Sequence, residues 1–248
     1  MEKPRIALIT GGMGGLGEAI ALRMCADGFR VVVTYSPHND HVNTWLEAQW
    51  GEGRNIAAYP VDVTDYGDCQ HCVVRVEAQI GPVDVLVNNA GMTRAGAFRD
   101  MSLEEWRMVM STDLDSMFHM TRPVCTGMAA RRWGRIVNIS SVSVLQGAIG
   151  NAGYAAATAG IHGLTKALAL ELAGNGVTVN TVSPGFLDTP MVHAIPADVL
   201  AQSILPAIPA GRLGRPAEVA GLVAYLCSED GAYVTGANLA INGGYHMS

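Results

Sequence analysis

The sequence predicts an α/β fold: a single-domain, Rossmann-type, doubly wound parallel sheet of about seven strands with helices on both faces. Two observations lead to this prediction. Short Val- and Ile-rich runs alternate with longer Ala- and Leu-rich segments, the order expected of repeated βαβ units. The strand candidates are also nearly continuous apolar runs, as strands that are covered on both faces require.

The predicted strands are spread along the whole chain. They cover 5–10, 29–35, 55–63, 83–89, 134–141, 177–184 and 237–243. Segments between them, such as 15–28 and 154–176, show helical spacing of apolar residues and end at glycine, a common helix stop. No repeat, low-complexity tract or linker divides the sequence, so we predict one domain over residues 1–248.

The composition excludes several classes of protein. The chain has 248 residues, 49% of them hydrophobic and 15% charged, which is enough for one large core. A net charge of −6 and the lack of a Lys/Arg-rich run argue against a nucleic-acid partner. No apolar run approaches the roughly 20 residues that span a bilayer, and the first residues lack the pattern of a signal peptide. We therefore expect a soluble, cytoplasmic protein with no membrane partner.

The five cysteines form no disulfide framework, because their number is odd and their spacing irregular. Cys69 and Cys72 spell C-x-x-C, a spacing found in redox and metal sites. No second Cys or His pair follows at zinc spacing, and the surrounding segment 66–81 has the pattern of an amphipathic helix. We interpret both as buried or half-buried structural cysteines and expect no metal site.

A glycine-rich turn, TGGMGGLG at 10–17, joins the first predicted strand to the first predicted helix. Gly11 permits a tight turn, Gly15 lets the backbone approach a pyrophosphate, and Gly17 allows close packing of helix on strand. Leu16, between the last two, belongs to the same set. The helix N-terminus adds N–H donors and a favourable dipole for an anion. The glycine spacing differs from G-x-G-x-x-G, so this is a variant of that dinucleotide fingerprint; a glycine turn without a ligand is the alternative.

The end of the second predicted strand bears on the choice of cofactor. An NAD-preferring site usually has Asp or Glu there to hydrogen-bond the ribose 2′-hydroxyl, but this strand ends with Thr34 and Tyr35. Nothing in that position repels a 2′-phosphate, and Ser36 and His38 follow as donors. The sequence therefore favours NADP(H) over NAD(H).

Asp62 and Val63 close the third predicted strand. Asp62 is well placed to hydrogen-bond an adenine ring. A turn or helix cap before Asp65 accounts for the same residue equally well, and the sequence alone does not decide between the two.

Six short motifs, in a fixed order, carry a resemblance to a known family. They are TGGMGGLG (10–17), DV (62–63), NNAG (88–91), NISS (138–141), the tyrosine at 154 and PGFLDTPM (184–191). With them the chain resembles the short-chain dehydrogenase/reductase family over essentially its whole length. RRWGRIVNISSV (131–142), GVTVNTVSPG (176–185) and INGGYHM (241–247) look most like the acetoacetyl-CoA reductases of polyhydroxyalkanoate synthesis and the related 3-oxoacyl-ACP reductases.

The resemblance implies a catalytic set of Ser, Tyr and Lys, with an Asn on a preceding helix. The family serine stands thirteen positions before the tyrosine, which selects Ser141 for Tyr154. Ser141 would hydrogen-bond the substrate carbonyl while Tyr154 donates its phenolic proton, roles that suit a polarising donor and a general acid. The resemblance assigns further residues to the nicotinamide end of the cofactor: Asn89, Gly91, Pro184, Gly185, Leu187 and Thr189.

Two positions depart from the family pattern. Thr158 stands one helical turn after Tyr154, where the resemblance implies a lysine that binds the ribose and lowers the tyrosine pKa. Thr158 can make one ribose hydrogen bond but brings no charge. Lys166 lies roughly 18 Å further along the helix and is too distant to replace it, and His162 is more simply a packed or capping histidine.

The second departure is Asp113, where the resemblance implies asparagine. The family asparagine acts partly through its main-chain carbonyl, which aspartate keeps. A carboxylate near Tyr154 would raise the tyrosine pKa further.

The connection 186–215 corresponds to the family's substrate lid, although its length alone also fits a long loop with short helices. Five apolar residues in it suit an acyl or pantetheine-like chain: Met191, Ile195, Leu200, Ile204 and Leu205. The INGGYHMS end resembles a subunit-contact tail, so a homotetramer is expected.

We predict an NADPH-dependent reductase of a 3-oxoacyl thioester, acetoacetyl-CoA to 3-hydroxybutyryl-CoA, with reduced activity because of Thr158 and Asp113. The alternative is a catalytically impaired cofactor-binding protein that acts as a silent or regulatory subunit. A third possibility is that Thr158 is a substitution introduced to inactivate the site.

Overall fold

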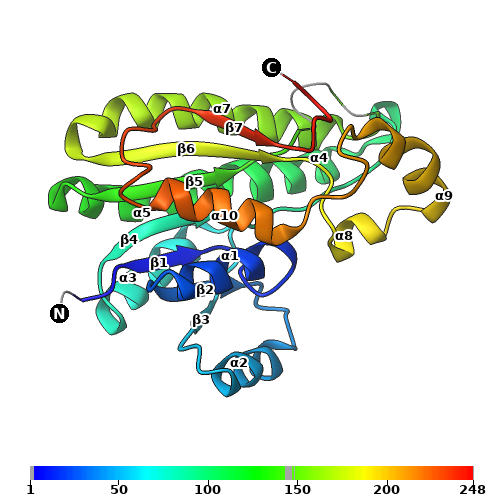
Figure 1. Cartoon of the computed structure of the whole chain (residues 1–248). Coiled ribbons are helices and arrows are strands. Elements are labelled where there is room, and N and C mark those ends of the chain that lie inside the picture. Colours follow the sequence, from blue (N-terminus) through cyan, green and yellow to red (C-terminus); the bar gives the residue numbers. More distant parts are fainter. Residues whose placement is uncertain (1–2, 143–146, 148, 248) are drawn as a thin grey trace.

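A computed structural model describes residues 3–142, 147 and 149–247 of the chain (Figure 1). Its centre is one sheet of seven parallel strands in the order β3-β2-β1-β4-β5-β6-β7. The strands are β1 (Ile6–Ile9), β2 (Arg30–Tyr35), β3 (Ala57–Pro60), β4 (Val83–Asn88), β5 (Gly134–Ile139), β6 (Val177–Pro184) and β7 (Asn238–Ile241). Each strand lies within the range predicted from the sequence, and the predicted Rossmann-type sheet is confirmed.

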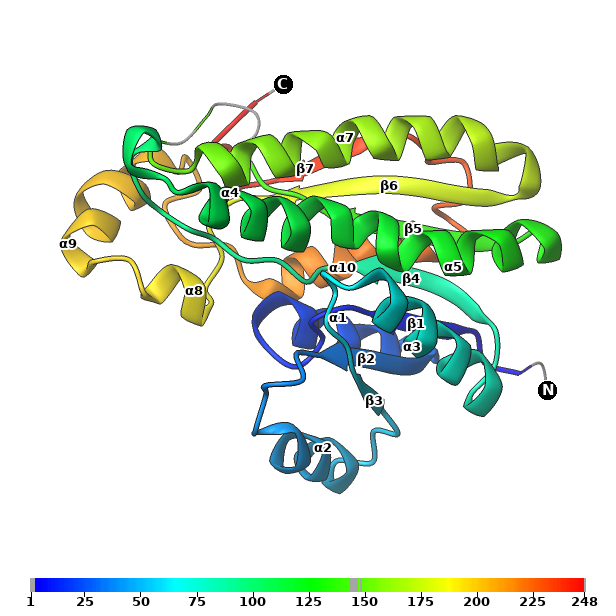
Figure 2. The same ribbon diagram turned by 180° about the vertical axis from the view of Figure 1, so that it is seen from behind.

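Helices cover both faces of the sheet. They are α1 (Gly15–Ala26), α2 (Val42–Gly51), α3 (Tyr66–Gln79), α4 (Leu103–Met110), α5 (Ser116–Arg131), α7 (Ala152–Leu172), α8 (Pro190–His193), α9 (Ala197–Val199) and α10 (Pro216–Cys227). Figure 1 shows α1 and α10 in front of the sheet, and Figure 2 shows α3, α4, α5 and α7 on the opposite side. A π-helical turn at Ser111–Asp115 joins α4 to α5. This arrangement follows from the chain's βαβ order.

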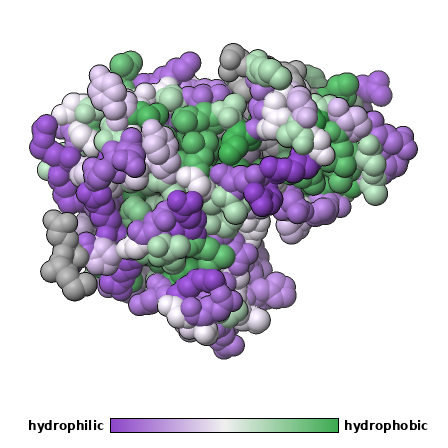
Figure 3. Space-filling model, in the orientation of Figure 1, coloured by the Kyte–Doolittle hydropathy of each residue, from purple (hydrophilic) through white to green (hydrophobic). Residues whose placement is uncertain are grey.

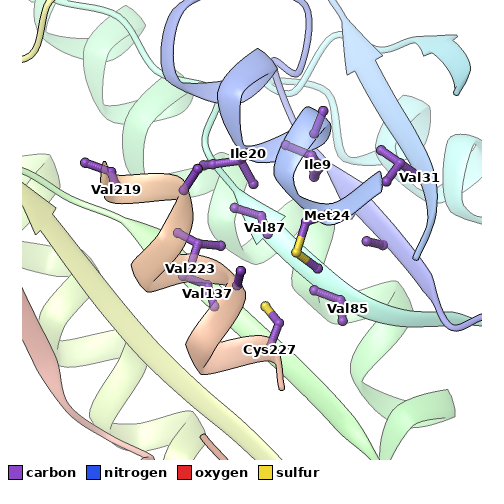
Figure 4. Packing of buried hydrophobic residues seen from close by; sticks show 14 of the residues in the cluster. Ile9, Ile20, Met24, Val31, Val85, Val87, Val137, Val219, Val223 and Cys227 are labelled. Carbon is purple, nitrogen blue, oxygen red and sulfur yellow. The ribbon is translucent and has the colours of Figure 1, made fainter. Parts of the chain in front are cut away.

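The core consists of two hydrophobic clusters, one on each face of the sheet. On the first face, Ile20 and Met24 of α1 and Val223 of α10 pack against the strands (Figure 4). Successive residues of one strand serve different clusters: Ile9 belongs to the first and Leu8 to the second. Since side chains of a strand alternate between faces, both faces of β1 must be apolar. This is the physical reason for the continuous apolar runs in the sequence.

Buried polar side chains tie α7 to the sheet. Asn88 of β4 donates to Asn138 of β5 at 2.8 Å, and Asn138 donates to Thr165 of α7 at 2.9 Å. Thr181 of β6 also donates to Thr165, at 2.8 Å. These paired groups fix the position of the long helix that carries Tyr154 and Thr158.

The connections leave β1 and β4 in opposite directions. After β1 the chain moves to β2 on one side, whereas β4, the other neighbour of β1, is followed by β5 on the other side. In open parallel sheets, ligands bind at the carboxyl ends of strands where the order reverses in this way. The fold therefore puts a binding crevice after β1 and β4.

Candidate active site

A cleft of about 1050 Å³ opens at the carboxyl ends of the strands. It brings together every residue that the sequence assigned to catalysis or to cofactor binding. The adenosine and phosphate part is lined by Gly11, Gly15, Leu16, Gly17, Tyr35, Asp62 and Val63, and the other part by Asn89, Gly91, Asp113, Ser141, Tyr154, Thr158, Pro184, Gly185, Leu187 and Thr189. Segments more than 150 residues apart in sequence thus share one cavity.

The glycine-rich turn needs its glycines. Gly11 and Gly15 have φ values of +61° and +52°, in the left-handed region that favours glycine. A Cβ on Gly17 would collide with the Gly11 carbonyl oxygen and lie 2.6 Å from Nδ2 of Asn89. That amide donates to the Thr10 and Gly11 carbonyls at 3.0 and 3.2 Å. The turn is therefore held against the loop after β4.

The open side of this turn fits a phosphate group. A Cβ on Gly14 would meet nothing within 4 Å, and one on Gly15 would first meet Thr189 at 3.8 Å. Helix α1 begins at Gly15 with no side-chain cap on its N-terminal N–H groups. A helix N-terminus with free N–H groups and an open, glycine-lined approach is a suitable cradle for a pyrophosphate.

Sequence reasoning missed the role of Thr10 in this cradle. Its hydroxyl oxygen accepts the N–H groups of Asn89 and Ala90, each at 2.9 Å. Thr10 thereby joins the end of β1 to the loop after β4. The sequence feature that could have revealed this role is the position of Thr10 at the start of TGGMGGLG, directly after an apolar strand.

At the adenosine end, the residues that follow β2 and β3 line the cleft. Tyr35 ends β2 and is followed by Ser36, Pro37 and His38 in the cleft wall, with no carboxylate at the strand end. Asp62 lies two residues beyond the end of β3, rather than closing the strand as we predicted. Its Oδ1 accepts the N–H of Thr64 at 2.9 Å and the Thr64 hydroxyl at 2.7 Å.

The turn interpretation of Asp62 is therefore confirmed, since its side chain closes the loop before α3. These hydrogen bonds hold the pKa of Asp62 below its usual range. Asp65 is the separate cap of α3, accepting the N–H of Asp68 at 2.8 Å. Asp62 also lines the cleft, so it remains a candidate for contact with the adenosine part of a cofactor.

Ser141 and Tyr154 form a hydrogen-bonded pair at the other end of the cleft. Burial raises the pKa of Tyr154 above its ordinary value, the Ser141 hydrogen bond opposes this rise, and the charge of Asp113 adds to it. The phenol is therefore protonated at neutral pH. A half-buried, protonated phenol beside a hydroxyl donor is the arrangement that can polarise a carbonyl and protonate its oxygen.

Thr158 is buried beneath this pair, with 2% of its surface exposed. Its hydroxyl donates to the Tyr154 carbonyl at 2.6 Å, the backbone interaction common for threonine inside a helix. The Thr158 hydroxyl thus donates within α7, so its oxygen can only accept a hydrogen bond from a ribose hydroxyl. Thr158 supplies neither the charge nor the donors of a lysine at this place.

Asp113 is also buried, with 3% of its surface exposed. One oxygen, Oδ1, accepts the N–H of Met92 at 2.7 Å. The other, Oδ2, is buried without a hydrogen-bond partner among the described residues. Burial raises the pKa of Asp113 to about 7, against the opposing effect of the Met92 N–H. The turn at Ser111–Asp115 thus places a carboxyl group that changes charge near neutral pH beside Tyr154.

No replacement for the missing lysine charge is found in the described part of α7. Lys166 is exposed on the helix and does not line the cleft. Nε2 of His162 lies 3.1 Å from the Ser140 hydroxyl and 3.5 Å from that of Ser183, outside the cleft lining. Burial lowers the pKa of His162, which keeps the imidazole neutral. The prediction that His162 is a packed histidine is confirmed.

Short helices make up much of the segment 186–215. Helices α8 and α9 stand out from the body beside the cleft (Figure 1), and hydrophobic side chains mix with hydrophilic ones on this lobe (Figure 3). Met191 lines the cleft and is 56% exposed. The other four residues that we predicted for an acyl chain lie outside the cleft lining: Ile195, Leu200, Ile204 and Leu205. All four are half-buried in the segment itself, so the structure does not place them as an acyl-binding wall.

The C-x-x-C pair is buried in α3, as predicted. Burial raises the pKa of Cys69 to about 12 and that of Cys72 to about 11, so both remain thiols. Within the described residues no group of His, Cys, Asp and Glu side chains has the arrangement of a metal site. None of the described helices is long and apolar enough to cross a membrane.

Comparison with known proteins agrees with the fold. Residues 11–246 match a protein-family model described as enoyl-(acyl carrier protein) reductase. The chain is 49% identical over 243 residues to the acetoacetyl-CoA reductase of Cupriavidus necator, covering 98% of each chain. It is 48% identical over 240 residues to nodulation protein G of Azospirillum brasilense, covering 97% of each. Identity to the 3-oxoacyl-[acyl-carrier-protein] reductase of Escherichia coli is 41% over 245 residues, covering 98% of each.

The fold and these matches define the class of protein as a Rossmann-type oxidoreductase that uses a nicotinamide cofactor. Within that class, the chain belongs to the short-chain dehydrogenase/reductase family, as the resemblance predicted.

Proposed function

We propose that this protein reduces a 3-oxoacyl thioester, with acetoacetyl-CoA as the first candidate, at the expense of NADPH. The observation that carries the proposal is the half-buried Ser141–Tyr154 pair at one end of a cleft whose other end has a glycine-lined phosphate cradle. Relatives named acetoacetyl-CoA reductase and 3-oxoacyl-[acyl-carrier-protein] reductase, similar along the whole chain, support the choice of substrate.

The nicotinamide supplies a hydride to the 3-carbonyl carbon when the cofactor is bound. Gly11, Gly15 and Gly17 would hold the pyrophosphate at the N-terminus of α1. Ser141 would donate a hydrogen bond to the carbonyl oxygen, and Tyr154 would give its phenolic proton to the same oxygen as negative charge develops there. The phenol is already protonated at neutral pH, so the reducing direction needs no prior activation of Tyr154.

NADP(H) is preferred in this proposal because β2 ends with Tyr35 and is followed by Ser36, with no carboxylate to repel a 2′-phosphate. In this proposal the chain is a single domain that acts in the cytoplasm as a homotetramer. The segment 186–215 is the lid that closes over the acyl chain of the substrate.

A second candidate function is a cofactor-binding subunit with little or no turnover. Two observations favour it. The Thr158 hydroxyl donates its hydrogen bond to the Tyr154 carbonyl, and the charge of Asp113 raises the pKa of Tyr154. A raised pKa makes Tyr154 a weaker proton donor to the substrate, and Thr158 brings no positive charge to offset that rise, while the phosphate cradle is unaffected.

The test measures NADPH binding, then NADPH oxidation with acetoacetyl-CoA, for the unsubstituted chain and for Thr158→Lys. We expect tight binding with weak turnover in the parent and turnover at least about tenfold higher with the lysine, since a catalytic group is worth orders of magnitude in rate. Ala159→Lys is the matched control, because it adds the same charge at an exposed position next to Thr158.

Parent turnover near a typical ~10 s⁻¹, unimproved by Thr158→Lys, would exclude a reduced activity. A Thr158→Lys/Asp113→Asn double variant that binds NADPH but reduces no 3-oxoacyl thioester would refute the substrate class.

A further inference from the structure

The charge of the cleft is unusual for a site that takes an anionic dinucleotide. Among the described residues that line it there is no lysine and no arginine. The ionisable side chains besides Tyr35 and Tyr154 are Asp62, His38 and Asp113. Asp62 and His38 interact with each other at the adenosine end. At the end that holds Tyr154, the group able to carry a charge at neutral pH is therefore Asp113.

The geometry of Asp113 leaves one oxygen for a ligand. Oδ1 is held by the Met92 N–H at 2.7 Å, whereas Oδ2 has no partner among the described residues although the side chain is almost fully buried. Gly91 lies beside it, since a Cβ there would be 3.3 Å from Oδ1. Asp113, Gly91 and Tyr154 all line the same end of the cleft. A buried carboxyl with an unused oxygen favours a positive charge nearby.

A nicotinamide ring differs in charge between its two states: the oxidised ring is a cation and the reduced ring is neutral. We propose that Asp113 makes this cleft distinguish the oxidation state of its cofactor, so that the ionised carboxylate binds the oxidised, cationic form more tightly than the reduced form. The inference rests on the proposed function, because it needs a nicotinamide cofactor in the cleft.

This preference should depend on pH. The pKa of Asp113 is raised to about 7, so the carboxyl is largely neutral at pH 6 and largely ionised at pH 8. Binding of a cation near the carboxylate lowers that pKa, and by linkage the affinity for the oxidised cofactor rises as pH increases through 7. The neutral reduced ring has no such attraction, so its affinity stays level or falls. The ratio of the two affinities therefore rises with pH.

The surrounding titratable groups do not account for such a change. On α4, α5 and α7, which pack against Ser111–Asp115, the partly buried ones are Glu105, His119, Cys125, Tyr154 and His162. Of these, Tyr154 is the group whose charge interaction reaches Asp113, and its raised pKa keeps it neutral between pH 6 and 8. The pKa of His162 is lowered and that of Glu105 is also lowered, so neither changes charge across most of this range.

The test titrates the full chain separately with NADP⁺ and NADPH at pH 6, 7 and 8 and reports the ratio of Kd for NADPH to Kd for NADP⁺. Because both nucleotides carry the same 2′-phosphate, its titration cancels in the ratio. An opposite charge close to a carboxyl lowers its pKa by about 1–3, so for a pKa of about 7 in the free protein we expect the ratio to rise roughly five- to tenfold from pH 6 to pH 8. The ratio should be level with pH in Asp113→Asn.

Asp115→Asn is the matched control, since it removes the same charge from an exposed position of the same turn and should behave like the parent. Carboxyl ¹³C NMR of the unsubstituted chain gives a second measurement that needs no variant: the pKa of Asp113 should fall on adding NADP⁺ and not on adding NADPH.

A parent ratio that does not change with pH, or a rise that persists in Asp113→Asn, would overturn the inference while leaving the proposed function standing. An absence of binding by both nucleotides at every pH would instead overturn the proposed function.

Discussion

The two ends of the cleft are built from different parts of the chain. The phosphate end is made of main chain: glycines with positive φ, the N-terminus of α1, and a loop fixed by Asn89 and Thr10. The catalytic end is made of side chains on the π-helical turn and α7, namely Asp113, Tyr154 and Thr158, with Ser141 after β5.

This difference explains why the two ends tolerate change differently. A side chain added at Gly17 collides with the backbone of Gly11, and one added at Gly11 or Gly15 needs a left-handed φ. Thr158 and Asp113, in contrast, are buried side chains that each make a hydrogen bond to the main chain, and they differ from the family pattern in charge. We therefore expect substitutions at the two ends to affect binding and chemistry differently.

The largest effect is expected from Gly17→Ala. The added Cβ would collide with the Gly11 carbonyl oxygen and crowd Asn89, which displaces the turn. We expect no measurable dinucleotide binding by calorimetry, and a loss of about 1–3 kcal/mol in the free energy of unfolding from overpacking. Gly51→Ala, at the end of α2 with nothing within 4 Å of the new Cβ, should bind and unfold like the parent. Full binding by Gly17→Ala would show that the close approach is unnecessary.

The next largest effect concerns the catalytic end. Tyr154→Phe removes the proton donor and should lower kcat with acetoacetyl-CoA by roughly 10²–10⁴-fold, the usual worth of a general acid, with the Kd for NADPH within about twofold of the parent. Tyr233→Phe, at a fully exposed tyrosine, is the control. Steady-state kinetics beside calorimetry separates the two quantities. Turnover that survives Tyr154→Phe would remove this tyrosine from the reaction.

The sequence was sufficient to predict the sheet and the cradle. Strands such as 134–141 and 177–184 can be predicted because burial on both faces requires continuous apolar runs. The observed β5 and β6 fall inside these ranges. The glycines of 10–17 are readable because positive φ and close approach leave almost no other residue. Burial of a strand on both faces and the backbone geometry of a glycine turn are local constraints, so a short stretch of sequence is enough to predict them.

The properties of the catalytic end depended on tertiary contacts that local sequence does not record. The sequence identified Asp113 as a departure from the family, but the burial that brings its pKa to about 7 comes from α4, α5 and α7 together. It identified Thr158 as uncharged, but not that its hydroxyl turns to the Tyr154 carbonyl. The arrangement of 186–215 was least predictable, since four of its five named apolar residues lie outside the cleft lining.

A smaller effect links Asp113 to folding. Its pKa is raised from 3.8 to about 7, so below pH 4 the carboxyl is protonated in both the folded and unfolded chains and has no effect on stability. Between pH 4 and 7 the unfolded chain releases the proton first, so stability falls as pH rises, and above 7 the penalty is constant. Asp113→Asn should therefore gain about 4 kcal/mol relative to the parent between pH 4 and pH 8, at ~1.4 kcal/mol for each unit by which the pKa is raised.

Urea denaturation of both proteins at the two pH values measures this difference. The exposed Asp115→Asn should show no such gain. An equal response of parent and Asp113→Asn to pH would mean that the carboxyl is solvated in the folded chain, which would also weaken the contrast between the two ends of the cleft.

The smallest expected effect tests whether cofactor choice belongs to the phosphate end. Tyr35 ends β2 at the cleft wall, and Tyr35→Asp would place there the carboxylate that hydrogen-bonds a ribose 2′-hydroxyl and repels a 2′-phosphate. We expect the preference for NADPH over NADH, measured as the ratio of Kd values, to fall about tenfold, a change of ~1.4 kcal/mol. Tyr35→Asn has nearly the same size without the charge and should shift the ratio much less. If both variants shift it equally, lost contacts of the Tyr35 ring, rather than charge, set the preference.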